Sequence, residues 1–121
     1  FNERGWAFVV IENEEMGVGI DPITFITPNN YVLRQNYPNP FNPTTTIEYE
    51  IPIDKNISIK VYNMMGQLVT TLVDNQYQTA GNHRVMWNGL NSSGIRVATG
   101  AYIYSLEWGN YRKTHKMLLL K

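Results

Sequence analysis

Residues 33–52, with the sequence LRQNYPNPFNPTTTIEYEIP, join a proline-rich loop directly to the clearest strand pattern in the chain. Pro38, Pro40 and Pro43 each fix their own φ angle and push the preceding residue toward extended geometry, which excludes a helix. In residues 45–51, apolar and polar side chains then alternate. This period of two is typical of a strand that buries one face.

The same pattern of strand and turn continues downstream of this stretch. Further strands are expected at residues 56–62, 67–73, 83–88, 101–108 and 111–120, with a short one upstream at 31–34 and a short extended piece at 95–98. Turn residues at 63–66 and 109–110 predict two hairpins, and a polar segment at 76–82 separates the first hairpin from the next strand.

These elements predict an all-β fold, because no window has the period of an amphipathic helix. About seven short strands at roughly ten-residue spacing are typical of a sandwich. We therefore expect an antiparallel immunoglobulin-like β-sandwich with an N-terminal extended arm. Trp87 is the expected core anchor, and Tyr102, Tyr104 and Leu106 are expected on the inner face of the terminal hairpin.

Several residues are expected to define the fold rather than to carry chemistry. The proline loop would hold Phe41 against one end of the sandwich, and Asn36, Asn39 and Asn42 would accept local backbone hydrogen bonds in Asx turns. Glycines in turns supply positive φ angles, and tyrosines hydrogen-bond across strand ends. The fold-defining positions are Pro38, Pro40, Phe41, Pro43, Gly66, Trp87, Gly94 and Tyr102.

Composition and motifs disfavour several functions. Basic and acidic residues balance at ten each, so no positive field favours nucleic acid. The longest apolar runs are far shorter than the roughly 20 residues of a spanning helix, so no membrane insertion is expected. The two histidines, His83 and His115, are isolated, and no nucleophile, phosphate-binding or calcium motif is present. We expect no enzyme activity, no cofactor and no metal.

The first part of the chain follows a different pattern. Residues 6–11 are apolar on both faces of an extended strand, which indicates a segment that needs a partner on each side. An acidic stretch and two glycines follow it. We divide the chain into an arm, residues 1–30, and a sandwich, residues 31–121.

Four motifs in the order NYPNPFNPTTTIEYEIP, IKVYNMMGQLVTTL, AGNHRVMWNGLNSSGIRVATGAYIYSLEWG and KTHKMLLLK cover residues 33–121. Together they resemble the C-terminal sorting domain of type IX secretion cargo and the related immunoglobulin-like domain of flagellar hook-capping proteins. The resemblance implies a secreted bacterial protein at the outer cell surface or outside the cell. It also implies that a secretion translocon reads the domain, and that surface machinery then removes it and attaches the cargo.

The same resemblance places the sorting signal in the closing basic and aliphatic motif. The implied signal residues are Lys113, Lys116, Met117, Leu118, Leu119, Leu120 and Lys121. The residues themselves also allow a simpler interpretation, in which the last four apolar residues form a core strand between solubilising lysines. Both interpretations can hold together.

A second hypothesis is a structural subunit of an extracellular filament or surface layer. An open sheet edge can accept an extended segment from an identical subunit, and repeated head-to-tail contacts make a homo-oligomeric fibre. The possible donor residues are Trp6, Ala7, Phe8, Val9, Val10 and Ile11. Alternatively, residues 1–30 are the tail of an upstream domain.

A third hypothesis is a carbohydrate-binding module. Such modules display exposed aromatic rings on a sandwich, and Trp6, Trp108 and Tyr111 are the candidates. Aromatic residues beside turns are more often packed against neighbouring strands.

Overall fold

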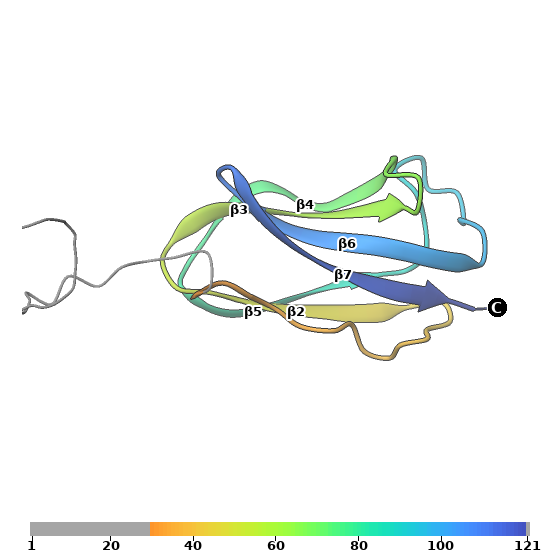
Figure 1. Cartoon of the computed structure of the whole chain (residues 1–121), viewed down its shortest axis with the longest axis horizontal. Helices are drawn as coiled ribbons and strands as arrows, with labels where there is room; N and C mark the ends of the chain where they lie inside the picture. The colour runs from red at the N-terminus through yellow and green to blue at the C-terminus, as the bar shows by residue number, and fades with distance from the viewer. Residues whose placement is uncertain (1–29, 121) are drawn as a thin grey trace, which may run out of the picture.

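The computed structural model describes residues 30–120, and Figure 1 shows two β-sheets that pack face to face. The strands are β1 (Val32–Leu33), β2 (Thr45–Ile51), β3 (Lys55–Asn63), β4 (Leu68–Gln78), β5 (Gly81–Trp87), β6 (Gly100–Trp108) and β7 (Tyr111–Leu119). One sheet has the order β1-β2-β5 and the other β4-β3-β6-β7, and all strand pairs are antiparallel. The expected immunoglobulin-like β-sandwich of about seven strands is confirmed.

Alternation in β2 sets the inner face of the three-stranded sheet. Ile47, Tyr49 and Ile51 are buried, whereas Glu48 between them is exposed. Burial of such side chains contributes about 1.5–3 kcal/mol each, which is why a one-residue change of register would be costly. β2 pairs with β5 along its full length, from Thr45 opposite Trp87 to Ile51 opposite Gly81.

Trp87 is the core anchor that the sequence predicts. Its ring is buried and lies 5.5 Å from the ring of Tyr102 in an edge-to-face arrangement. The Phe41 ring lies on another side, with the ring centroids 5.7 Å apart. The indole Nε1–H donates to the carbonyl of Leu90, so the only polar atom of this large side chain has a partner.

The four-stranded sheet contributes the other half of the core. Ile57, Ile59 and Val61 of β3 are buried, and so are Tyr104 and Leu106 of β6. The expected inner face of the terminal hairpin is therefore confirmed.

The strand β4 is longer than the sequence predicts, because it continues through polar residues to Gln78 opposite Lys55. A bulge interrupts its pairing with β3, and Asn75 has a φ of 47° there. The backbone N–H of Asn75 donates to Ser58 Oγ at 2.9 Å. The extra residue breaks the alternation from which the strand would have been recognised. The expected polar separator at 76–82 is therefore wrong for residues 76–78, which belong to β4, and for residues 81–82, which belong to β5.

Two loops have the same hydrogen-bonding design. Asn63 Oδ1 accepts from the backbone N–H groups of Met65 and Gln67, the two residues on either side of Gly66, which has a φ of 83°. In the loop between β5 and β6, Asn91 Oδ1 accepts in the same way from Ser93 and Ile95, and Gly94 has a φ of 78°. Both glycines therefore hold the positive φ that the turns require. The extended piece expected at 95–98 is reduced to one bridge, between Leu90 and Arg96.

Residues 1–29 and Lys121 lie outside the described part of the chain. The arm, the donor segment at 6–11 and the boundary at residue 30 therefore stay predictions. Within residues 30–120, no helix has the length and hydropathy needed to span a bilayer.

Candidate functional site

The last strand, β7, carries most of the predicted signal residues and divides them between two faces. Met117 and Leu119 point inward and are buried. Lys116, Leu118 and Leu120 alternate with them and are exposed. The strand thus contributes to the core with one set of side chains and presents a basic and aliphatic set outward.

Lys113 belongs to the inner set by its position but is only half-buried, near the β6–β7 turn. It lies opposite Leu106 of β6. The structure therefore separates Lys113 from the outward Lys116, and Lys121 lies outside the described residues.

The backbone of Phe41 covers the outer edge of β7 near its end. The N–H of Phe41 donates to the carbonyl of Leu118, and the N–H of Leu120 donates to the carbonyl of Phe41, each at 2.9 Å. Because these two bonds flank Leu119, the two segments form a parallel bridge. The Phe41 side chain is meanwhile buried against Trp87, which confirms that the proline loop closes this end of the sandwich.

Two side chains continue this cover along the edge. Asn39 Oδ1 accepts from the backbone N–H of Leu118 at 3.0 Å, and Gln35 Nε2 donates to the carbonyl of Lys116 at 2.8 Å. Phe41, Asn39 and Gln35 are thus the hydrogen-bond partners of the β7 backbone on the side that faces away from β6, from the Lys116 carbonyl to the Leu120 N–H. The end of β7 is therefore a closed edge, which does not template another strand.

The expected Asx turns of the loop are wrong for Asn36 and Asn39, and no hydrogen bond of Asn42 occurs among residues 30–120. Asn36 is buried, and its Nδ2 donates to the carbonyl of Pro38 and to Thr45 Oγ1, so it acts here as a donor. Asn39 accepts from a distant strand rather than from its own turn. The sequence does not reveal these partners, because they depend on how loop and strand pack.

The segment that leads into the loop also contacts the terminal hairpin. The Tyr104 hydroxyl donates to the carbonyl of Arg34 at 2.5 Å, and His115 Nε2 lies 2.7 Å from the carbonyl of Leu33. Burial raises the pKa of Tyr104 to about 12, so its hydroxyl remains a donor at neutral pH. His115 thus has a structural partner, as expected for a lone histidine.

Three cations outside β7 form ion pairs, whereas the cations of β7, like Lys55 and Arg96, have none among residues 30–120. Arg34, Lys60 and Arg84 pair with Glu50, Glu107 and Glu48, at 3.4, 3.3 and 3.6 Å. Arg112, Lys113 and Lys116 have no ion-pair partner among residues 30–120. Since β7 contains no carboxylate, its outer surface is positively charged.

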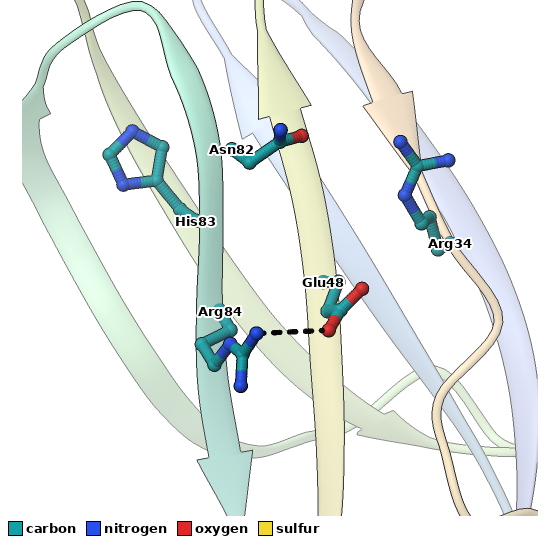
Figure 2. Close-up of a pocket in the computed structure, with 5 residues that line it drawn as sticks. All are labelled: Arg34, Glu48, Asn82, His83 and Arg84. Carbon is teal, nitrogen blue, oxygen red and sulfur yellow. Dashed lines mark ion pairs between the residues drawn. The ribbon is translucent and has the colours of Figure 1, made fainter.

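A polar depression of about 320 Å³ lies on the three-stranded sheet, lined by Arg34, Glu48, Asn82, His83 and Arg84. Figure 2 shows the Arg84 guanidinium beside Glu48 and the His83 ring pointing away from that pair. His83 Nε2 lies 2.6 Å from the carbonyl of Thr79. Because Arg34, Glu48, His83 and Arg84 already have partners, the depression is a solvated sheet face. No cluster of metal-ligating side chains occurs in the described residues.

The aromatic platform expected for a carbohydrate-binding module is wrong at Trp108. This side chain is only 5% exposed, and it stacks on Tyr31 with a centroid distance of 3.9 Å and an interplanar angle of 9°. The Tyr111 ring also stacks with Trp108, with the centroids 6.1 Å apart, and Tyr111 is exposed. Trp6 lies outside the described residues. Trp108 therefore holds the start of the sandwich against the β6–β7 turn.

Residues 35–120, from the proline loop to the end of β7, match the model of the secretion system C-terminal sorting domain. The chain belongs to this family. This sorting domain is thus part of a secreted protein, held at the cell surface or released from the cell. No curated protein matched the chain.

Solved structures share its fold. PorU of Porphyromonas gingivalis, in a dimeric latent form, aligns with a TM-score of 0.61 at 20% identity over 84% of this sorting domain and 10% of PorU. PorZ of the same organism, an essential surface component of the type IX secretion system, aligns at 0.51 with 24% identity over 72% and 11%. The chain spans about a tenth of either protein's length.

FlgD of P. aeruginosa aligns with a TM-score of 0.50 at 26% identity, over 62% of this sorting domain and 57% of FlgD. The fold is therefore shared between secretion components and FlgD. The predicted relation to both groups is confirmed.

Proposed function

We propose that this sorting domain is a non-catalytic module that the type IX translocon recognises through β7. The observation that carries the proposal is the division of one strand into two faces. Met117 and Leu119 fix the strand in the core, while Lys116, Leu118 and Leu120 are displayed outward. On this proposal the core-strand and signal interpretations of the terminal residues are both correct.

We further propose that the exported protein is held at the outer cell surface after the sorting domain has been removed. The family membership supports this step, because the resemblance implies it. The translocon is the proposed partner, and no cofactor is required.

Export of a reporter fused to the N-terminus of the full chain tests the proposal in a host with type IX secretion. Deleting residues 116–121 would be a poor test, because it removes the buried Met117 and Leu119 and unfolds the domain. The variants Lys116→Glu and Leu118→Ser change only exposed side chains. Thr114→Ser, an exposed position on the same strand, is the matched control.

The expected result is that both variants reduce export and the control does not. Unchanged export of both variants would contradict the assignment of the signal to β7. Fractionation of cells and medium, with the mass of the reporter, then shows whether the exported protein is surface-bound and lacks the sorting domain.

The filament hypothesis stays a prediction, since its donor segment at 6–11 lies outside the described residues. No contact of the described residues favours it over sorting.

A further inference from the structure

An apolar strip crosses the outer face of the four-stranded sheet and reaches the predicted signal. Directly opposed residues in neighbouring strands share a face. Tyr62 of β3 lies opposite both Leu68 of β4 and Ile103 of β6, and Ile103 lies opposite Lys116 of β7. These four side chains therefore form one row across all four strands.

A second, shorter row lies next to the first. Ala101 of β6 lies opposite Leu118 of β7, and each is two residues from a member of the first row. We define the outer-sheet patch by its six residues, Leu68, Tyr62, Ile103, Lys116, Ala101 and Leu118. Leu68 is 54% exposed and Leu118 39% exposed, so the two flanks of the patch are open to solvent.

The adjoining part of the same face is polar, and its polar side chains hydrogen-bond and pair with one another. Glu107 accepts hydrogen bonds from Tyr62 and Ser105 at 2.8 Å and pairs with Lys60 at 3.3 Å. The outer face thus changes from a closed polar network to an apolar strip. Its middle, Tyr62, Ile103 and Ala101, is half-buried, and its ends, Leu68 and Leu118, are exposed. Exposed sheet faces usually carry polar side chains, so an apolar strip on one points to a binding partner.

Contacts already described prevent a partner from binding the end of β7 through its backbone edge or through its inward side chains. Its outer edge from Lys116 to Leu120 is bonded to Gln35, Asn39 and Phe41, which prevents strand addition. Its inward side chains are in the core. A partner of the folded domain therefore reaches the end of β7 through its outward side chains, of which Lys116 and Leu118 belong to the outer-sheet patch.

Charge indicates the chemistry of the partner. Lys116 lies at the rim of the patch, and it has no ion-pair partner among residues 30–120. Arg112, an exposed residue on the same outward face of β7, extends the positive charge along the strand. A complementary surface would combine an apolar strip with carboxylates beside it.

We propose that the outer-sheet patch is the docking surface for a protein component of the type IX machinery, one with an apolar strip flanked by acidic residues. The inference rests on the proposed function and extends the recognition surface from β7 to β3, β4 and β6. A sorting signal of this kind exists only in the folded domain, because its residues come from four strands.

The first test uses the reporter fusion with the full chain and the double variant Leu68→Ser, Ile103→Thr, neither residue of which lies on β7. Met86→Ser on β5 is the matched control, since Met86 is 62% exposed on the opposite sheet. The expected result is a loss of export on the order of tenfold in the double variant and none in the control. The midpoint of urea unfolding establishes that each variant is folded.

The outcomes separate this inference from the proposed function. If Lys116→Glu stops export and the folded double variant exports normally, the patch is wrong and the signal in β7 stands. If neither affects export, both proposals fail.

The second test identifies the occupant. A photoreactive phenylalanine analogue at position 68 is irradiated during export, and the cross-linked species is identified by mass spectrometry. A cross-link to an outer-membrane component of the secretion machinery, lost when Lys116→Glu is added, supports the inference. Cross-linking only to lipopolysaccharide, or only to a second copy of the chain, overturns the assignment of the partner.

Discussion

Phe41 and Leu119 form a parallel bridge, and this contact makes the proline loop a direct neighbour of the last strand. The loop comes before the first long strand in the sequence, whereas β7 ends the sandwich. The match to the sorting family begins at residue 35 and ends at residue 120, so it contains both sides of this contact. Loop and terminal strand are therefore one structural unit.

Replacing Phe41 by alanine should reduce the free energy of unfolding by about 3–5 kcal/mol, because a buried ring is lost beside Trp87. Tyr37→Ala, in the same loop but with an exposed side chain, should change it by less than about 0.5 kcal/mol. Urea denaturation of the full chain measures both. Equal costs at the two positions would show that Phe41 does not close the sandwich.

Asn39→Ala should remove one hydrogen bond at the edge of β7 and leave the packing of the core unchanged. The Leu118 N–H loses its acceptor, at a cost of about 0.5–1.5 kcal/mol. Hydrogen exchange at the Leu118 amide should accelerate more than exchange in β3. Asn42→Ala, which changes an exposed asparagine of the same loop, should leave the exchange at Leu118 unchanged. If both variants behave alike, the Asn39 bond is not formed in solution.

The Glu107 network should make stability depend on pH. Burial alone would raise the pKa of Glu107, but hydrogen bonds from Ser105 and Tyr62, together with Lys60, outweigh it and lower the pKa. A lowered pKa in the folded state means that the ionised carboxylate stabilises the fold above the ordinary carboxyl value. This contribution is lost as the pH falls through the folded-state pKa.

Unfolding measured from pH 7 down to pH 3 therefore checks the network, with Glu107→Gln as the variant. The difference in unfolding free energy between wild type and variant should be largest at neutral pH, roughly 1 kcal/mol, and should shrink in acid. Glu48→Gln, which affects a more exposed ion pair, should cost less than about 0.5 kcal/mol at pH 7. A difference at Glu107 that stays constant with pH would contradict the network.

Gly66→Ala should destabilise the domain by about 1–2 kcal/mol, because its φ of 83° is unfavourable for a residue with a Cβ. An added Cβ would meet no atom within 4 Å, so the cost comes from the backbone alone. Gly66→Asn should cost less, since asparagine tolerates this conformation better. Met65→Ala, at the neighbouring exposed position, is the control. Thermal unfolding that ranks Ala and Asn equally would argue against backbone strain.

Local patterns in the sequence predict much of this fold. Alternation around Ile47 and Tyr49 predicts a strand with one buried face, and Trp87 is the expected anchor, because both depend on side chains adjacent in the sequence. The positive φ at Gly66 follows from turn chemistry in the same way. The extension of β4 is missed, because the bulge at Asn75 breaks the period.

The contacts that shape the candidate site are mostly long-range and are harder to predict. The sequence around Asn39 does not indicate that its Oδ1 accepts from the Leu118 N–H. The sequence around Trp108 does not indicate that the Tyr31 ring stacks on it. The outer-sheet patch depends on the strand order β4-β3-β6-β7, which brings Leu68 and Lys116 into one row. Periodicity gives the face of each strand but not its neighbours.

The stacking of Tyr31 on Trp108 determines where the upstream chain leaves the sandwich. Trp108 ends β6 at one pole, whereas Leu119 lies opposite Gly100 at the other, where the chain reaches its C-terminal end (Figure 1). At about 3.4 Å per residue, the eight steps from the first to the last of the nine residues of β6 separate the two poles by roughly 27 Å. The described chain therefore begins at the pole opposite the end of β7, where the predicted signal residues Met117 to Leu120 lie.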